Sequence, residues 1–468
     1  MKNLFVSFSI GTIMAILATM FGIKSILFLL IISYVFFCYN NPEKCFWITY
    51  FLMLALPLGS GNKIIVYLSI TIAGITINMI EAMVIANSII ILIGRKGRKF
   101  EINNFINIAF LILVLSYGFY FFIGINKGYK AIWDFKIYII QILLFYSTYK
   151  IIKDSDDVKK LLNITFYASL SNSIITIIMY LTSSWSVWGL NYSGGRFGGN
   201  FVTILIISMS YAVFIFYNKS SEVKRWILFV AMIAGMITMF LSQNRSNPIL
   251  LLISSILIIV VCLFNNRSDR NIIGKISLAL ILGISILFGV AKFLYGESDF
   301  ANRYISIIEN KDDNNLGTRA KTIEYYSEII KSKPFGNGFG TTMPFIDSNG
   351  NVKYDQSMNV DNSYINIARK CGINTLIIYI IVILSPLFIL KRLYKYNKNI
   401  IYKQLAISYF MLLIATSILT SQSIHSYAVS SFIWVLISYL NLELVKFKKA
   451  SVEENYYEKS IDSQCCTN

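Results

Sequence analysis

The chain has 468 residues, of which 56% are hydrophobic and only 14% are charged. Soluble domains average roughly 25% charged residues, so this composition excludes a water-soluble globular protein. The net charge of +18 would suit a nucleic-acid-binding protein, but the basic residues form short clusters between apolar runs, as in the cytoplasmic loops of membrane proteins. We therefore expect membrane lipid, and no nucleic acid, as a partner.

Apolar runs long enough to cross roughly 30 Å of hydrocarbon as helices recur along most of the chain. The sequence therefore predicts an all-α polytopic membrane protein with about 12 to 14 transmembrane helices. The predicted spans lie at 4–22, 25–39, 46–58, 64–93, 105–123, 131–149, 161–181, 199–217, 226–242, 248–264, 276–294, 373–390, 404–420 and 426–444.

The region 46–94 leaves the number of spans open. Its first run, 46–58, is short and ends at Pro57. The second run, 64–93, is overlong and carries Asn78 and Glu81. This second run is therefore either one broken helix or a re-entrant pair.

The basic clusters fall on alternate connections from Arg95 onward, which predicts that those connections and both termini are cytoplasmic. The clusters lie at 95–99, 150–160, 219–225, 267–275, 391–398 and 446–449. We divide the chain into five parts. The first two are N-terminal helices (1–100) and central helices (101–295) with outer loops 182–198 and 242–247. The others are one large extracytoplasmic loop (296–372), C-terminal helices (373–445) and a cytoplasmic tail (446–468).

Two arginines on the predicted outer face run against the usual bias of positive charge toward the cytoplasm. Arg196 and Arg245 each precede an apolar helix, with Asn200 and Asn247 placed as N-caps. A guanidinium beside the free N–H groups of a helix N-terminus suits phosphate oxygens, so two such sites suit a diphosphate. The alternative is that both arginines snorkel to lipid headgroups.

The large loop is the one long polar segment, and a loop of this length usually has a structure and a function of its own. Arg319, Ile323, Tyr326 and Ile330 follow helical spacing, which predicts a helix that presses its apolar face onto the membrane domain and aims Arg319 inward. The alternative is an amphipathic helix with a solvated arginine. The sequence GNGFG at 336–340 is either a turn or a backbone nest for an anion.

Asp361 stands where the apolar pattern resumes after the loop. It is either the N-cap of the next helix or a carboxylate that accepts a proton from an attacking hydroxyl. Asp134 and Lys136 form either a simple ion pair or part of the site. The six cysteines and the single histidine, His425, show no metal-ligand spacing, so we expect no metal and no cofactor.

Four segments together resemble the O-antigen polymerase and O-antigen ligase family, the Wzy-like membrane glycosyltransferases. They are RFGGN at 196–200, SQNRSNPILLL at 242–252, the GTR…PFGNGFG block of the large loop, and DNSYINIARKCGINT at 361–375. The resemblance covers roughly the last 290 residues. O-antigen ligases of the family carry histidine, then Asn, Ser or Gln, nine residues, and Gly-x-x-[Gly/Thr/Tyr]. Asn362, Gly372 and Thr375 fit this pattern, but Asp361 replaces the histidine, which favours a polymerase.

The resemblance implies a GT-C-like fold and a metal-independent, inverting transfer from a polyprenyl (undecaprenyl) diphosphate-linked oligosaccharide. Arg196 and Arg245, with Asn200 and Asn247, would hold the diphosphate, and Arg319 and Asp361 would be catalytic. Candidate glycan-binding residues are Asn362, Tyr364, Asp134 and His425. The site would face the outside or periplasm of the bacterial plasma (inner) membrane, and a flippase and a chain-length regulator are implied partners.

We therefore predict a surface polysaccharide polymerase, for capsule or O-antigen, that joins the growing glycan to an incoming lipid-linked repeat unit. One alternative is a ligase that moves finished glycan to another acceptor. The other is a lipid-linked oligosaccharide flippase or another transporter. Transporters usually place charges near the bilayer midplane, whereas the charges here concentrate at the outer face.

Overall fold

A computed structural model describes most of the helical part of the chain. The described residues are 33–56, 69–72, 75–94, 100, 104–152, 157–181, 200–218, 223–242, 246–265, 324–342, 344–346, 352–354, 362–416 and 428–446. The predicted spans 4–22 and 276–294 lie outside them.

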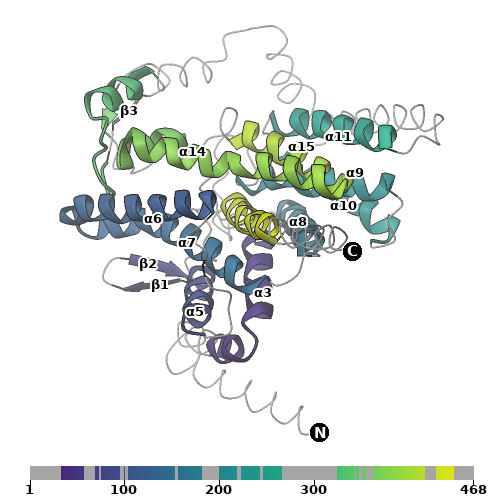
Figure 1. Cartoon of the computed structure of the whole chain (residues 1–468), viewed down its shortest axis with the longest axis horizontal. Helices are drawn as coiled ribbons and strands as arrows, with labels where there is room; N and C mark the ends of the chain where they lie inside the picture. The colour runs from purple at the N-terminus through teal and green to yellow at the C-terminus, as the bar shows by residue number, and fades with distance from the viewer. Residues whose placement is uncertain are drawn as a thin grey trace, which may run out of the picture.

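The described elements are helices together with two small hairpins (Figure 1). Their bounds are α3 (Pro42–Ala55), β1 (Ser69–Ile72), β2 (Ile75–Asn78), α5 (Met79–Ile93), α6 (Phe105–Gly124), η1 (Ile125–Lys127), α7 (Tyr129–Ile151), α8 (Asp157–Leu181), η3 (Asn200–Ile204), α9 (Leu205–Tyr217), α10 (Arg225–Leu241), α11 (Ser246–Asn265), β3 (Pro344–Ile346), β4 (Val352–Tyr354), α14 (Ser363–Asn397) and α15 (Ile400–Ile414). Further helices lie at 33–40, at 324–332 and at Ala428–Lys446.

The prediction of an all-α polytopic membrane protein is confirmed. Within the described residues, five helices are long and apolar enough to cross a membrane, and shorter apolar helices accompany them. The five cover Phe105–Lys127, Tyr129–Ile151, Val158–Leu181, Ser363–Asn397 and Ala428–Lys446. Apolar side chains such as Leu115, Phe119 and Phe122 of α6 are exposed, as expected for a helix face that meets lipid.

The overlong apolar run at 64–93 is broken at Asn78. Before it, β1 and β2 pair as an antiparallel hairpin, with Ser69 opposite Asn78. After it, α5 begins with a reciprocal capping box: the Asn78 side chain accepts from the Glu81 N–H at 2.8 Å, and the Glu81 carboxylate accepts from the Asn78 N–H at 2.9 Å. The broken-helix prediction holds in part, because one half of the run is helical and the other half is a hairpin.

Three helices form the half of the bundle that carries the candidate site. Figure 1 shows α6 and α7 side by side, and α14 packs along α6. Aromatic side chains fill this core: the ring of Phe110 stacks on Phe145 at 3.8 Å between centroids, and Trp434 of the helix Ala428–Lys446 packs against both rings. Burial of such large apolar side chains stabilises the packing of the helices.

The helix α14 consists of two helices joined at Gly372. Gly372 has φ 77° and ψ 167°, which no residue inside a continuous helix adopts. Residues 363–371 therefore form a short helix of their own, and the long membrane-crossing part begins at 373. A β-carbon on Gly372 would also lie 2.9 Å from the carbonyl oxygen of Pro334, so the position requires glycine.

Candidate functional site

The segment 333–342, here called the glycine loop, is the part of the large loop that docks on the helix bundle. Gly336, Gly338 and Gly340 have φ values of 80°, 78° and 75°, a left-handed conformation that glycine adopts without strain. The loop passes close to other backbones: a β-carbon on Gly340 would lie 2.6 Å from the nitrogen of Ala131. The three glycines are therefore required both by conformation and by space, since a β-carbon on any of them would lie less than 3.0 Å from a backbone atom.

Each backbone N–H from Gly336 to Gly340 donates to a protein acceptor. Two donate to α14: Asn337 to the Arg369 carbonyl and Gly338 to the Lys370 carbonyl, both at 2.9 Å. Phe339 donates to the Tyr120 carbonyl of α6 at 3.2 Å, and Gly340 donates to the Asp134 carboxylate of α7 at 2.9 Å. Of the two alternatives from the sequence, the segment is a turn, and the anion that it holds is the carboxylate of Asp134.

Asp134 is buried and forms an ion pair with Lys370. The Lys370 Nζ lies 2.5 Å from Oδ1 of Asp134, and both side chains are almost fully buried. The second carboxylate oxygen, Oδ2, accepts from Gly340. One carboxylate thus joins α7, the short helix 363–371 and the glycine loop, and both of its oxygens are used by protein donors.

Of the two alternatives for Asp134 and Lys136, the simple ion pair between them is wrong. Lys136 pairs instead with Glu81 of α5, with 2.8 Å between Nζ and Oε1, and it also donates to the carbonyl of Thr76 at 2.8 Å. Residues two apart on a helix point in different directions, so the two charged groups of α7 have separate partners.

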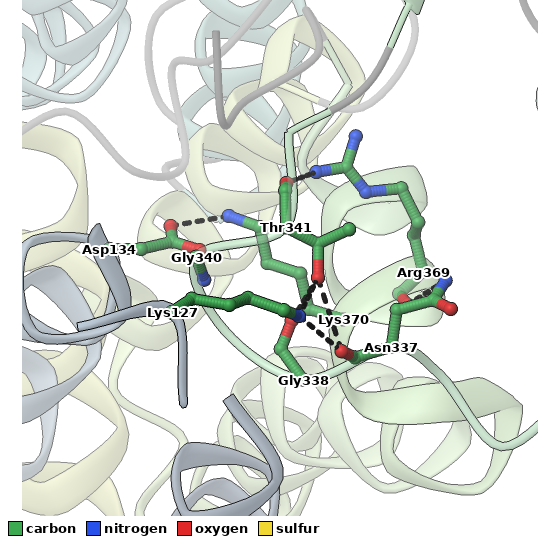
Figure 2. Close-up of polar contacts among 8 residues, drawn as sticks. All are labelled: Lys127, Asp134, Asn337, Gly338, Gly340, Thr341, Arg369 and Lys370. Atoms are coloured by element: carbon green, nitrogen blue, oxygen red, sulfur yellow. Dashed lines mark hydrogen bonds and ion pairs between the residues drawn. The ribbon is translucent and has the colours of Figure 1, made fainter. Parts of the chain in front are cut away.

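Two further cations bind the glycine loop from opposite sides (Figure 2). Lys127 of η1 donates to the carbonyl of Asn337 at 2.6 Å and to the hydroxyl of Thr341. The guanidinium of Arg369 donates to the carbonyl of Thr341 at 2.8 Å. The loop is therefore fixed by side chains from η1, α7 and α14 as well as by its own backbone.

Phe339 anchors the same loop in the apolar core. Its side chain is fully buried, and its ring centroid lies 5.0 Å from that of Tyr138 and 5.1 Å from that of Phe135, both on α7. The neighbouring Phe335 is exposed. One aromatic residue of the loop thus inserts between the helices while the other remains outside.

The helix that precedes the glycine loop spans 324–332. Its Tyr326 is buried and packs with Tyr325, Ile329 and Ile365. Tyr326 therefore packs on the short helix 363–371, and the contact of its helix with the membrane-crossing helices stays a prediction. Arg319 and Ile323, which we placed on the same face, lie outside the described residues.

Asn362 and Tyr364 lie at the start of the short helix 363–371. The side-chain oxygen of Asn362 accepts from the N–H groups of Tyr364 at 2.9 Å and Ile365 at 3.2 Å, so Asn362 occupies the N-cap position that we considered for Asp361. The Tyr364 ring is half-buried, with its centroid 6.2 Å from that of Tyr379. Glycan binding by Asn362 and Tyr364 stays a prediction.

The two helix starts that follow Arg196 and Arg245 lie beside each other. The helix α11 begins at Ser246, so Asn247 sits in its first turn and not at the predicted N-cap, and it is followed by Pro248. Asn247 is fully buried, and its amide nitrogen lies 3.5 Å from the hydroxyl of Thr203 in η3, which begins at Asn200. The remaining predicted site residues, Arg196, Arg245, Asp361 and His425, fall outside the described residues.

Sequence reasoning missed Lys127, Arg369 and Lys370. The pair Arg369–Lys370 directly precedes an apolar run of membrane-spanning length, and charged residues at that depth are rare unless they are paired. That signal could have singled out both residues. Nothing in the sequence links Lys370 to Asp134, which lies 236 positions earlier.

A family model described as O-Antigen ligase matches residues 227–380, about a third of the chain. The matched region runs from α10 to the first turns of the long part of α14, so it contains α11, the glycine loop, Asn362 and the Arg369–Lys370 pair. The comparisons with curated proteins and with solved structures gave no match.

Proposed function

We propose that this chain is a surface polysaccharide polymerase, because residues 227–380 match the family model described as O-Antigen ligase, which is consistent with membership of the O-antigen polymerase and ligase family. It joins the growing glycan of one polyprenyl diphosphate carrier to an incoming lipid-linked repeat unit. The observation that carries the proposal is this family match within a polytopic membrane chain. The product is a capsule, an O-antigen or a related surface glycan.

The proposed reaction is glycosyl transfer at the outer face of the bacterial plasma membrane. A hydroxyl oxygen of the incoming repeat unit forms a bond to the anomeric carbon of the growing glycan, and the bond from that carbon to the diphosphate oxygen breaks. Asp361 takes the proton of the hydroxyl, and the carrier leaves as its diphosphate anion. Arg319 stabilises the reacting groups, and no metal step is required by this residue set.

Arg196 and Arg245 bind the leaving diphosphate in this proposal. The adjacent starts of η3 and α11 support it, since Asn247 approaches Thr203 there and each arginine precedes one of the two starts in the sequence. Free N–H groups at two neighbouring helix starts favour negative charge, and fixed donors of this kind stabilise a leaving anion at little reorganisation cost.

A ligase and a flippase are the two alternatives to the polymerase. A ligase would transfer the finished glycan to another acceptor, and the family description favours it. The aspartate at position 361, where the resembling ligases carry histidine, favours the polymerase. A flippase would move lipid-linked units across the membrane without forming a glycosidic bond.

Deletion of the gene in its host separates the three functions. Loss of a polymerase leaves single repeat units on their lipid carrier at the outer face, and the long glycan disappears. Loss of a ligase leaves full-length glycan on the carrier without its acceptor, and loss of a flippase leaves single units on the cytoplasmic face. The size and sidedness of the lipid-linked glycan in the deletion strain and in the complemented strain therefore test the proposal.

A further inference from the structure

The carboxylate of Asp134, on α7, contacts two separate parts of the candidate site, the short helix 363–371 and the glycine loop. It accepts from Lys370 at 2.5 Å and from Gly340 at 2.9 Å, and its own residue belongs to α7. Its side chain has no exposed surface. A group so enclosed does not touch a substrate, but it determines where its partners lie.

Lys370 occupies the C-terminal end of the short helix 363–371, which the break at Gly372 separates from the membrane-crossing part of α14. The N-terminal end of this helix carries the Asn362 cap, directly after Asp361. Nine residues of helix place the two ends roughly 13 Å apart. An anchor on Lys370 therefore fixes the short helix, whose N-cap residue directly follows Asp361 in the sequence.

The glycine loop is fixed to the same end of the short helix. Asn337 and Gly338 donate to the carbonyls of Arg369 and Lys370, and Ile373 donates back to Pro334 at 2.9 Å. Gly340 then reaches the carboxylate of Asp134. The loop, the short helix and α7 thus meet at one buried ion pair, and the loop continues from the helix 324–332, which follows Arg319 in the sequence.

We infer that Asp134 is a positioning residue for glycosyl transfer, which holds the short helix 363–371 and the glycine loop so that Asp361 and Arg319 meet the lipid-linked substrate. This inference rests on the proposed polymerase function. It assigns Asp134 a role through Lys370 and Gly340 in place of a direct glycan contact. The pairing with Lys370 is the element on which the role depends.

The inference predicts a characteristic pattern in three variants of the full-length protein in proteoliposomes. The substrate is the lipid-linked repeat unit that accumulates in cells lacking this chain. Asp134→Asn and Lys370→Gln should each lower kcat about tenfold to a hundredfold, as misplacement of a reacting group does, and leave KM within about twofold. The double variant Asp134→Asn/Lys370→Gln removes both charges and restores an amide–amide bond, so it should recover activity above either single variant.

A matched variant controls for lost stability. Glu81→Gln breaks a second, partly buried ion pair of α7, that with Lys136, which does not contact the glycine loop. Its kcat per folded protein should stay close to that of the wild type. A double variant as inactive as the single Asp134→Asn would show that the carboxylate itself takes part in the reaction or in binding, and would overturn the positioning role.

Limited trypsin digestion tests, independently of activity, whether the Asp134–Lys370 ion pair holds the short helix 363–371 in place. Arg369 and Lys370 are buried in the intact protein, so cleavage after them should be slow in the wild type and in Glu81→Gln, and faster in Asp134→Asn. Unchanged cleavage together with unchanged kcat in Asp134→Asn would overturn the inference alone. A wild-type chain that never elongates glycan would overturn the proposed function, and the positioning role for that reaction would be lost with it.

Discussion

Gly124 at the end of α6 lies directly against the backbone of Phe339 in the glycine loop. A β-carbon on Gly124 would lie less than 3.0 Å from the nitrogen and the carbonyl oxygen of Phe339, whereas one on Gly118, earlier in the same helix, would meet no atom within 4 Å. The backbone at the end of α6 is therefore in direct contact with the backbone of the glycine loop. Only glycine at position 124 permits this contact.

Gly124→Ala should displace the glycine loop and destabilise the protein by about 1–3 kcal/mol, the usual cost of overpacking. Gly118→Ala is the matched control, and because alanine favours helix over glycine it should be neutral or slightly stabilising. Thermal unfolding of the two variants in detergent measures the difference. Equal melting temperatures would contradict the close packing of the loop on α6.

Phe339→Ala should leave a cavity between the aromatic side chains of α7 and destabilise the protein by about 3–5 kcal/mol. Phe335→Ala is the control in the same loop, because the Phe335 side chain is 74% exposed whereas that of Phe339 is fully buried. The amount of each variant in the membrane and its melting temperature in detergent are the measurements. A loss in Phe335→Ala as large as that in Phe339→Ala would argue against the buried position of Phe339.

Glu81→Gln should leave the half-buried charge of Lys136 with the Thr76 carbonyl but without its carboxylate, and destabilise the protein by about 1–3 kcal/mol. The double variant Glu81→Gln/Lys136→Met should recover much of this loss, since neither charge is then left alone. Glu43→Gln provides the comparison, because Glu43 and Lys160 form an exposed pair at 3.0 Å that contributes about 0–1 kcal/mol. If the double variant were less stable than Glu81→Gln, the pairing with Lys136 would be wrong.

Hydropathy predicted the membrane-crossing helices closely because burial in lipid demands long apolar runs. The span expected at 105–123 is the helix Phe105–Gly124, and the span expected at 131–149 lies within the helix Tyr129–Ile151. The hairpin at 69–78 was missed, because its alternating Ile and Thr residues lie inside one apolar run. A strand pattern of that length is hidden when its polar residues are threonines.

The contacts of the candidate site could not be predicted in the same way. The glycines at 336, 338 and 340 indicated a turn, but nothing local showed that the turn docks on Tyr120, Asp134 and the Arg369–Lys370 carbonyls. Ion pairs between distant segments depend on which helices pack together, and the periodicity of apolar residues along the chain does not predict that packing. A local signal exists for the Asn78 cap, whose partner Glu81 is three residues away, but from the sequence the two polar residues predicted only a break in the apolar run.

Arg196→Ala, Arg245→Ala, Arg319→Ala and Asp361→Ala should each shorten the surface glycan toward one repeat unit while the protein still accumulates in the membrane. The first three remove charge that would stabilise the leaving diphosphate, and the fourth removes the proton acceptor. Arg225→Ala is the control, since Arg225 is exposed at the start of α10 and belongs to a predicted cytoplasmic cluster. Electrophoresis of the glycan gives the size profile. A normal ladder in all four variants would exclude the proposed outer-face site.

The most direct test of the polymerase function is a reconstitution. Purified wild-type protein in proteoliposomes receives lipid-linked repeat units, and mass spectrometry follows the glycan on each carrier while a phosphate assay follows the carrier that is released. The account predicts glycans of two, three and more units, with one polyprenyl diphosphate released for each bond formed and none released by Asp361→Ala. Units that cross the bilayer without joining, or that join only to a different acceptor, would contradict it.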